Sequence, residues 1–227
     1  MSEQKPKETR HPVIAVEGAI GAGKSTFLRW VRAEYAADGH VVGDEYVSHL
    51  MPRYYANERR WALATQIDSL VGRVYLGRAA LKVARESTVW LDRSVYGDLA
   101  FARANHATGR LAPEEYRIYM DARDALTLPQ VDAILWLDTP SATCAARRRA
   151  RASAGEFIPY DYEEALLASY HDVLADAESR GVRVFRAGWG AHLVPHTEDY
   201  SRAARHLLRV FAEFLGSPLS ADGYEPQ

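Results

Sequence analysis

The residues with the clearest chemical purpose form a glycine-rich stretch near the start of the chain. This stretch fits the pattern G-x-x-x-x-G-K-[ST], and an apolar run precedes it. Glycines let backbone N–H groups close around phosphate oxygens, and the start of a following helix adds partial positive charge. We therefore expect it to hold the phosphates of a nucleoside triphosphate, with the lysine on the terminal phosphates. The expected contacts are Gly18, Ala19, Gly21, Ala22, Gly23, Lys24, Ser25 and Thr26.

Charged residues follow the second and third predicted strands, at the point where each strand ends. These residues are Glu45 after the second strand, and Asp92 and Arg93 at the end of the third. Ligands of open parallel sheets bind at the carboxyl ends of the strands. Phosphoryl transfer to a hydroxyl needs a carboxylate to accept the proton and a cation to stabilise the migrating charge. Glu45 fits the first role and Arg93 the second, while Ser25 and Asp92 are the expected Mg²⁺ contacts. The alternatives are a solvated strand end and a surface ion pair.

A run of arginines occupies residues 147–151, which read Arg-Arg-Arg-Ala-Arg. Arg147 and Arg151 are four residues apart and therefore share one face of a helix. Such a face can clamp phosphates and stabilise the oxygens of a transferring phosphoryl group. An RNA-binding or merely solvated basic face is the alternative. The position of the run after the fourth predicted strand favours an Arg-rich lid over the phosphates.

The strands and helices that must position these residues can be predicted from the alternation of apolar runs and amphipathic stretches along the sequence. Short apolar runs rich in β-branched residues predict strands, and the amphipathic stretches between them predict helices. Strands that alternate with helices indicate an α/β fold with a five-stranded parallel sheet flanked by helices. The expected strands are 13–17, 40–44, 88–92, 132–138 and 182–186, and the expected helices are 24–38, 58–86, 95–107, 113–127, 141–152, 160–180 and 198–215.

Composition narrows the class of protein. The 227 residues carry a net charge of -2, which argues against a nucleic-acid coat or a polybasic membrane binder. The single cysteine, Cys144, excludes an intramolecular disulfide, and no apolar run approaches the ~20 residues of a membrane span. With no apolar N-terminal segment, we expect a cytoplasmic location. The predicted organisation is one domain over 12–216, with a disordered leader at 1–11 and a flexible tail at 217–227.

Over about residues 13–172 these motifs resemble the deoxynucleoside kinase family, in its deoxycytidine, deoxyguanosine and deoxyadenosine kinase branch. Residues 45–47 (Glu-Tyr-Val) are similar to the family's E-P-V, and residues 61–66 match its W-x-x-x-x-Q segment. Residues 92–94 (Asp-Arg-Ser) match its E/D-R-S. The resemblance implies a P-loop kinase fold that uses ATP and Mg²⁺ to phosphorylate the 5′-hydroxyl of a 2′-deoxynucleoside. In that family the glutamate of the first motif is the base, which is Glu45 here.

The resemblance also implies how the acceptor is held. Gln66 matches the glutamine that bonds the base, and Arg73 and Asp98 match a pair that this branch uses near the base. The thymidine-accepting branch lacks that pair, so deoxyadenosine, deoxyguanosine or deoxycytidine is favoured over thymidine. Tyr55 and Glu156 match residues that contact the 3′-hydroxyl. The spacing agrees, because Gln66 and Arg73 are seven apart and share a helix face.

The sequence departs from the family at two positions of the base pocket. Thr65 replaces an aromatic residue, and Ala102 stands where the family has a stacking phenylalanine. A roomier pocket would admit a purine or a modified nucleoside. The loop from Arg186 to Pro195 is the expected region for the adenine of ATP, and the resemblance implies a homodimer through long helices.

Two other functions share the phosphate loop. A nucleoside monophosphate kinase, such as a thymidylate kinase, would need a second phosphate-binding arginine near the acceptor and no base at Glu45. A non-catalytic regulator would bind ATP and turn over no acceptor. A GTPase is disfavoured because no N-K-x-D motif occurs.

Overall fold

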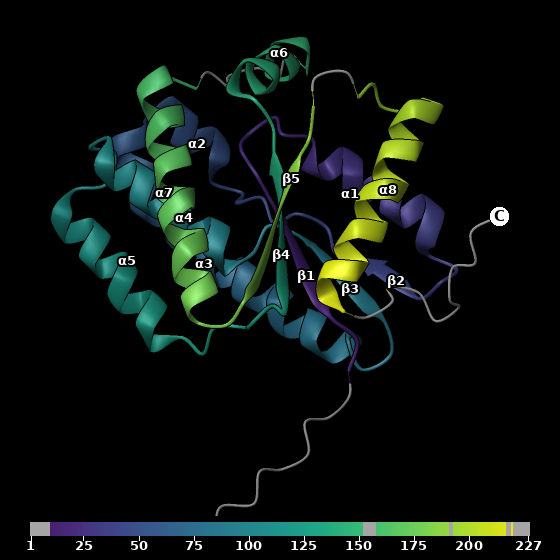
Figure 1. The fold of residues 1–227 in the computed structure, drawn as a ribbon. Helices are drawn as coiled ribbons and strands as arrows, with labels where there is room; N and C mark the ends of the chain where they lie inside the picture. Colours follow the sequence, from purple (N-terminus) through teal and green to yellow (C-terminus); the bar gives the residue numbers. More distant parts are fainter. Residues whose placement is uncertain (1–9, 152–157, 191–192, 217–218, 220–227) are drawn as a thin grey trace, which may run out of the picture.

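The computed structural model describes residues 10–151, 158–190, 193–216 and 219. Its centre is a parallel sheet with the strand order β2-β3-β1-β4-β5 (Figure 1). The strands are β1 (Val13–Glu17), β2 (His40–Val42), β3 (Thr88–Asp92), β4 (Ala133–Asp138) and β5 (Arg183–Gly188). Every neighbouring pair is parallel, which confirms the predicted five-stranded sheet. Because β1 lies between β3 and β4, the crossovers run to opposite sides of β1, and ligands of such sheets bind beyond the strand ends at that point.

Helices cover both faces of this sheet. They are α1 (Lys24–Tyr35), α2 (Met51–Ala56), α3 (Glu58–Val83), α4 (Val95–Ala107), α5 (Pro113–Ala125), α6 (Ser141–Arg151), α7 (Tyr160–Ser179) and α8 (Glu198–Leu215). Figure 1 shows α3, α4, α5 and α7 on one side, α1 and α8 on the other, and α6 beyond the carboxyl ends of the strands. None of the described helices is long and apolar enough to cross a membrane.

Side chains of the strands alternate between two hydrophobic clusters, one on each face. In β1, Val13 and Ala15 join the cluster under α3, α4 and α7. Ile14 and Val16 join the cluster under α1 and α8. This period of two residues is what a strand buried on both faces produces. The apolar run that predicted β1 is therefore explained by burial on both sides.

Local sequence signals explain where several of the helices begin. Ser94 is the N-cap of α4, and its hydroxyl accepts a hydrogen bond from the backbone N–H of Tyr96 at 3.2 Å. Pro113 begins α5, and the carboxylate of Glu115 accepts a bond from the backbone N–H of Ala112 at 2.8 Å. Thr197 caps α8 in the same way as Ser94 caps α4. These ends agree with the predicted helices.

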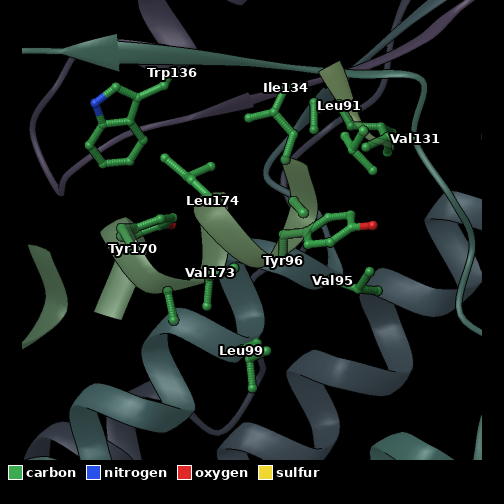
Figure 2. Packing of buried hydrophobic residues seen from close by; sticks show 14 of the residues in the cluster. Leu91, Val95, Tyr96, Leu99, Val131, Ile134, Trp136, Tyr170, Val173 and Leu174 are labelled. Atoms are coloured by element: carbon green, nitrogen blue, oxygen red, sulfur yellow. The ribbon is translucent and has the colours of Figure 1, made fainter. Parts of the chain in front are cut away.

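The cluster between α4, α7 and the sheet is shown in Figure 2. Trp136 of β4 lies over Tyr170 of α7, with ring centroids 4.9 Å apart, and Leu174 follows one turn later. Tyr96 of α4 lies beside Leu174, and Leu99 of the same helix lies farther from the strands. This packing holds α7 against α4 beneath the carboxyl half of the sheet.

The main differences from the predicted elements lie at boundaries and in one short helix. The sequence pattern extended β2 to residue 44, α1 to 38 and α3 to 86, whereas the structure ends them at Val42, Tyr35 and Val83. Polar side chains at strand and helix ends carry little periodic signal, so such boundaries are poorly defined by pattern. Helix α2 was not predicted, because six residues are too few to show a helical repeat.

Candidate active site

A cavity of about 740 Å³ runs along the carboxyl edge of the sheet. It brings together side chains from seven helices, α1, α2, α3, α4, α6, α7 and α8, and from the loops between the elements. The predicted site residues that line it are Gly21, Gly23, Lys24, Ser25, Thr26, Glu45, Tyr55, Gln66, Arg73, Arg93, Asp98, Arg147 and Arg151. Asp92 instead lines a smaller neighbouring cavity that also touches Ser25 and Glu45. Glu156 lies outside the described residues.

The phosphate loop has the backbone that its glycines allow. Gly21 and Gly23 have φ values of 91° and 103°, in the region that favours glycine. Gly23 is also the N-cap of α1 and carries no side chain, so the first N–H groups of α1 are left for a ligand. Lys24 is buried, and its ammonium donates to the carbonyl oxygens of Gly18 at 3.2 Å and Ala19 at 3.0 Å. Burial, with the charge of Arg93 nearby, lowers the pKa of Lys24 to about 8.

Ser25 and Asp92 meet beside the loop. The Ser25 hydroxyl donates a hydrogen bond to Asp92 Oδ2 at 2.7 Å. Asp92 is buried, and its other oxygen, Oδ1, is one of the few buried polar atoms of the described residues without a hydrogen-bond partner. A hydroxyl beside an unsatisfied carboxylate oxygen is a donor set that Mg²⁺ accepts when nucleotide phosphates supply further ligands. Across the described residues no cluster of three or more His, Cys, Asp or Glu side chains could hold a metal ion.

Glu45 and Arg93 form an ion pair between β2 and β3. Arg93 Nε donates to Glu45 Oε1 at 3.2 Å. Partial burial raises the pKa of Glu45, but Arg93, Lys24 and Arg73 outweigh it and leave the pKa below its ordinary value. Glu45 is therefore an ionised carboxylate at neutral pH. It stands in the cavity between the phosphate loop and the residues predicted to bind the base.

At the far end of the cavity, Gln66 and Arg73 of α3 meet Asp98 of α4. Gln66 Nε2 donates to the backbone oxygen of Asp98 at 3.0 Å and to its Oδ1 at 3.1 Å. Arg73 Nε lies 3.6 Å from the same Oδ1, and the Tyr119 hydroxyl donates to Oδ2 at 2.6 Å. Burial raises the pKa of Asp98, although Arg73 opposes that shift. The predicted polar pair on α3 is thus joined through one buried carboxylate.

Two residues of this end were not predicted. The Tyr54 hydroxyl donates to Asn105 Oδ1 at 2.8 Å, and Asn105 Nδ2 donates to Gln66 Oε1 at 3.2 Å. Both line the cavity and are buried. Asn105 follows Asp98 by seven residues and so shares its face of α4, which is the one signal in the sequence that could have pointed to it.

Some buried polar atoms of α3 that lie beside the cavity have no hydrogen-bond partner among the described residues. Thr65 Oγ1 and Arg73 Nε and Nη1 are buried without a hydrogen-bond partner among the described residues. Buried polar groups are usually paired, so groups left unpaired beside a cavity favour a ligand that completes them. Thr65 lies at the position where the sequence departs from the family, and Ala102 is buried on α4 and does not line the cavity.

The arginines of α6 lie against the phosphate loop. Arg147 donates to the carbonyl oxygens of Ala22 at 2.7 Å and Gly190 at 3.0 Å. Arg148, which was not predicted, donates to Ile20 O at 2.7 Å and forms an ion pair with Glu163 of α7 at 2.8 Å. Arg151 is exposed at the rim of the same cavity. Arg147 and Arg148 therefore contact the backbone of the phosphate loop.

The cavity also includes part of the loop after β5 and one residue of α8. Trp189, Leu193, Pro195 and Tyr200 line it together with Arg147. Arg186, at the start of the loop named from the sequence, instead pairs with Glu178 at 2.7 Å on the surface.

Comparisons with known proteins agree with this geometry. The sequence model of the family described as deoxynucleoside kinase matches residues 14–207. A putative deoxynucleoside kinase of frog virus 3 is 30% identical over 161 residues, covering 70% of this chain and 80% of that protein. A deoxyguanosine kinase of Dictyostelium discoideum is 26% identical over 182 residues, covering 78% of this chain and 64% of the relative.

A solved structure shares the fold. Deoxyadenosine kinase from M. mycoides, determined with products dCMP and dCDP, superposes with a TM-score of 0.74 at 20% identity. The match covers 88% of this chain and 99% of that one. The P-loop kinase fold expected from the sequence is therefore confirmed. From the family match over residues 14–207, the chain belongs to the deoxynucleoside kinase family.

Proposed function

We propose that this kinase transfers the terminal phosphoryl group of ATP to the 5′-hydroxyl of a purine or cytosine 2′-deoxynucleoside in preference to thymidine. The observation that carries the proposal is the Glu45–Arg93 pair, 3.2 Å apart, in one cavity with Lys24 and Gln66. A carboxylate beside a guanidinium, with a phosphate loop on one side and the polar side chains of Gln66, Arg73 and Asp98 on the other, suits transfer to a nucleoside hydroxyl.

The donor would be held by the phosphate loop and the arginines of α6. Lys24 would exchange its bonds to the carbonyls of Gly18 and Ala19 for oxygens of the β- and γ-phosphates. Ser25 and Asp92 would hold Mg²⁺, which neutralises phosphate charge when it is bound. Arg147 and Arg151 would approach the transferring group from the other side.

Glu45 would accept the proton of the 5′-hydroxyl as the oxygen bonds to the γ-phosphorus. The bond from that phosphorus to the bridging oxygen breaks at the same time, and ADP leaves. Arg93 would stabilise the equatorial oxygens, and its proximity keeps Glu45 ionised and ready to accept the proton. Tyr55, together with Glu156 by resemblance, would hold the 3′-hydroxyl.

The choice of base is proposed to depend on Arg73 and Asp98. Arg73 Nη1 is a buried donor without a hydrogen-bond partner among the described residues, so a base that presents an acceptor to it would satisfy it. N7 and O6 of guanine are acceptors of this kind. Deoxyguanosine is therefore our first candidate among the three, and the Dictyostelium relative is named for that substrate.

A monophosphate acceptor is disfavoured by charge pairing. Three arginines at the acceptor end face carboxylates: Arg73 faces Asp98, Arg93 faces Glu45, and Arg110 faces Glu58 at 2.6 Å. A second phosphate would have to displace one of these partners. The nucleoside is thus the better acceptor for this cavity.

The test is ADP release with ATP and Mg²⁺ across the four natural deoxynucleosides and their 5′-monophosphates. We expect turnover on deoxynucleosides, and loss of most of it in Glu45→Gln with ATP binding retained. Turnover restricted to a monophosphate, with Glu45→Gln near normal, would overturn the proposal. ATP binding with no turnover on all eight compounds would indicate a regulator.

We also propose a homodimer that forms through α3 and α5, in the cytoplasm. Val71 and Tyr75 are one turn apart on α3 and are 54% and 73% exposed, and Ile118 on the neighbouring α5 is 50% exposed. Contiguous exposed apolar residues mark interaction surfaces. Light scattering should give twice the chain mass, and Tyr75→Glu should give the single mass.

A further inference from the structure

Arg93 has an unusual backbone and a crowded set of partners. Its φ of 70° lies in the left-handed region, where non-glycine residues are uncommon. Its Nε binds Glu45, and its Nη1 donates to Gly18 O at 3.2 Å and to the hydroxyl of Tyr170. The guanidinium also lies over the ring of Phe101, 4.8 Å from its centroid. A residue in a strained conformation is kept there by its surroundings, so these partners define where the guanidinium points.

Tyr170 is the partner that comes from farthest along the chain. It is fully buried in the middle of α7, and its hydroxyl donates to Glu17 Oε2 at 3.0 Å. A guanidinium only donates and an ionised carboxylate only accepts. The direction of both bonds is therefore fixed: the Tyr170 hydroxyl accepts a hydrogen bond from Arg93 and donates one to Glu17.

Glu17 anchors this chain of bonds to α4. Its Oε1 accepts from the backbone N–H of Ser94 and from the Ser94 hydroxyl, both at 2.8 Å, and from the N–H of Gly97 at 3.2 Å. A Cβ at Gly97 would lie 2.4 Å from Oε2, so glycine is required there. The carboxylate is buried at the positive end of a helix and is held rigidly.

The ring of Tyr170 has its own support, separate from its hydroxyl. It packs against Trp136 at 4.9 Å (Figure 2) and against the edge of Phe101 at 6.3 Å. Removing only the hydroxyl would therefore leave the ring in place. The function of the hydroxyl can be separated from the packing of the residue.

We propose that Tyr170 is a positioning residue that, with Glu17, holds the Arg93 guanidinium against Glu45 and over the path of phosphoryl transfer. The inference rests on the proposed function. Without the hydroxyl, Arg93 loses one of its two bonds at Nη1 and can swing toward Glu17, which lies 3.9 Å from Nη1. The guanidinium would then be misplaced in the transition state, while the ATP and nucleoside sites would be unchanged.

The test is a double-mutant cycle between Tyr170→Phe and Arg93→Lys, measured after turnover of the wild type has been established. Tyr170→Phe should lower kcat about 10- to 100-fold, the range for a lost bond to a charged group. The KM values for ATP and nucleoside should stay within about twofold, since neither site is touched. In the Arg93→Lys background the same change should cost less than about threefold, because the partner is already gone.

The matched control is Tyr96→Phe. Tyr96 is also buried, belongs to the same cluster, and its hydroxyl points away from Tyr170 in Figure 2. This variant should keep wild-type kcat.

An equal kcat loss from Tyr170→Phe in both Arg93 backgrounds, or a rise in both KM values, would overturn the inference and indicate a structural role. If Tyr170→Phe proves unstable, Glu17→Gln is tested in the same cycle and should show the same dependence on Arg93. Inactivity of the wild type on every nucleoside would instead contradict the proposed function.

Discussion

Asn105 Nδ2 donates to Gln66 Oε1 at 3.2 Å, and this bond sets which way the Gln66 amide faces. The backbone oxygen of Asp98 accepts from Gln66 Nε2 on the other side. Together the two partners place the amide oxygen and the amide nitrogen in a defined order along the cavity wall. A base that bonds Gln66 must match that order.

Replacing Asn105 by aspartate is the cleanest test of this arrangement. Asn105→Asp keeps the shape and exchanges the donor for an acceptor, which repels Gln66 Oε1. We expect KM for the nucleoside to rise about 10-fold, from a cost of about 1–3 kcal/mol for an unpaired buried group. KM for ATP should not change.

The control is Asn57→Asp, because Asn57 caps α3 at the surface and aspartate caps equally well. That variant should keep wild-type kinetics. A rise in the ATP KM of Asn105→Asp as large as that for the nucleoside would contradict the assignment.

The pH profile should report Glu45. Arg93, Lys24 and Arg73 hold its pKa below the ordinary value, so the base stays ionised throughout the neutral range. As pH falls through that lowered pKa, Glu45 gains a proton and cannot accept the one from the 5′-hydroxyl. We expect kcat/KM for the nucleoside to be flat at neutral pH, with an acid limb below about 4.3, the usual glutamate value. Circular dichroism at each pH checks that the fold persists, and a limb near pH 6–7 would argue against Glu45 as the base.

The effect of Arg73 and Asp98 on substrate choice can be separated from their effect on stability only if both residues are replaced together. Asp98→Ala alone leaves a buried guanidinium without its carboxylate and should destabilise the protein by about 3–5 kcal/mol. Arg73→Met with Asp98→Ala removes both charges and should melt at a higher temperature than that single variant. The double variant should also shift the substrate ranking toward thymidine. An unchanged ranking in a folded double variant would remove the pair from base selection.

The sequence was most informative about site residues that lie close together along the chain. The phosphate loop, the residues at the ends of β2 and β3, and the spacing of Gln66 and Arg73 can each be read within one motif. The alternation of apolar strands and amphipathic helices likewise predicted all five strands and the sheet they form.

The partners missed from the sequence are joined across long separations. Glu17 ends an apolar strand and lies 77 residues before Ser94 and 153 before Tyr170, with which it bonds. No pattern of period two or 3.6 connects such positions, because only the folded chain brings them together. Arg148 was missed for another reason. Within a run of arginines, the sequence pattern does not show which arginine forms an ion pair with a carboxylate.

Metal dependence provides the last prediction. Asp92 Oδ2 accepts from Ser25, and Oδ1 has no hydrogen-bond partner among the described residues, so Asp92→Asn would place an amide where a charged oxygen should meet the ion. We expect the Mg²⁺ concentration for half-maximal rate to rise about 10- to 100-fold, the range for residues that orient a metal. Titration of Mg²⁺ at fixed ATP measures it, with Asp138→Asn as control, since Asp138 ends β4 on the surface and does not line the cavity. If excess Mg²⁺ restores the rate of Asp92→Asn, the carboxylate acts through the ion. If the rate stays low at every Mg²⁺ concentration, Asp92 serves the fold of the phosphate loop through Ser25 instead.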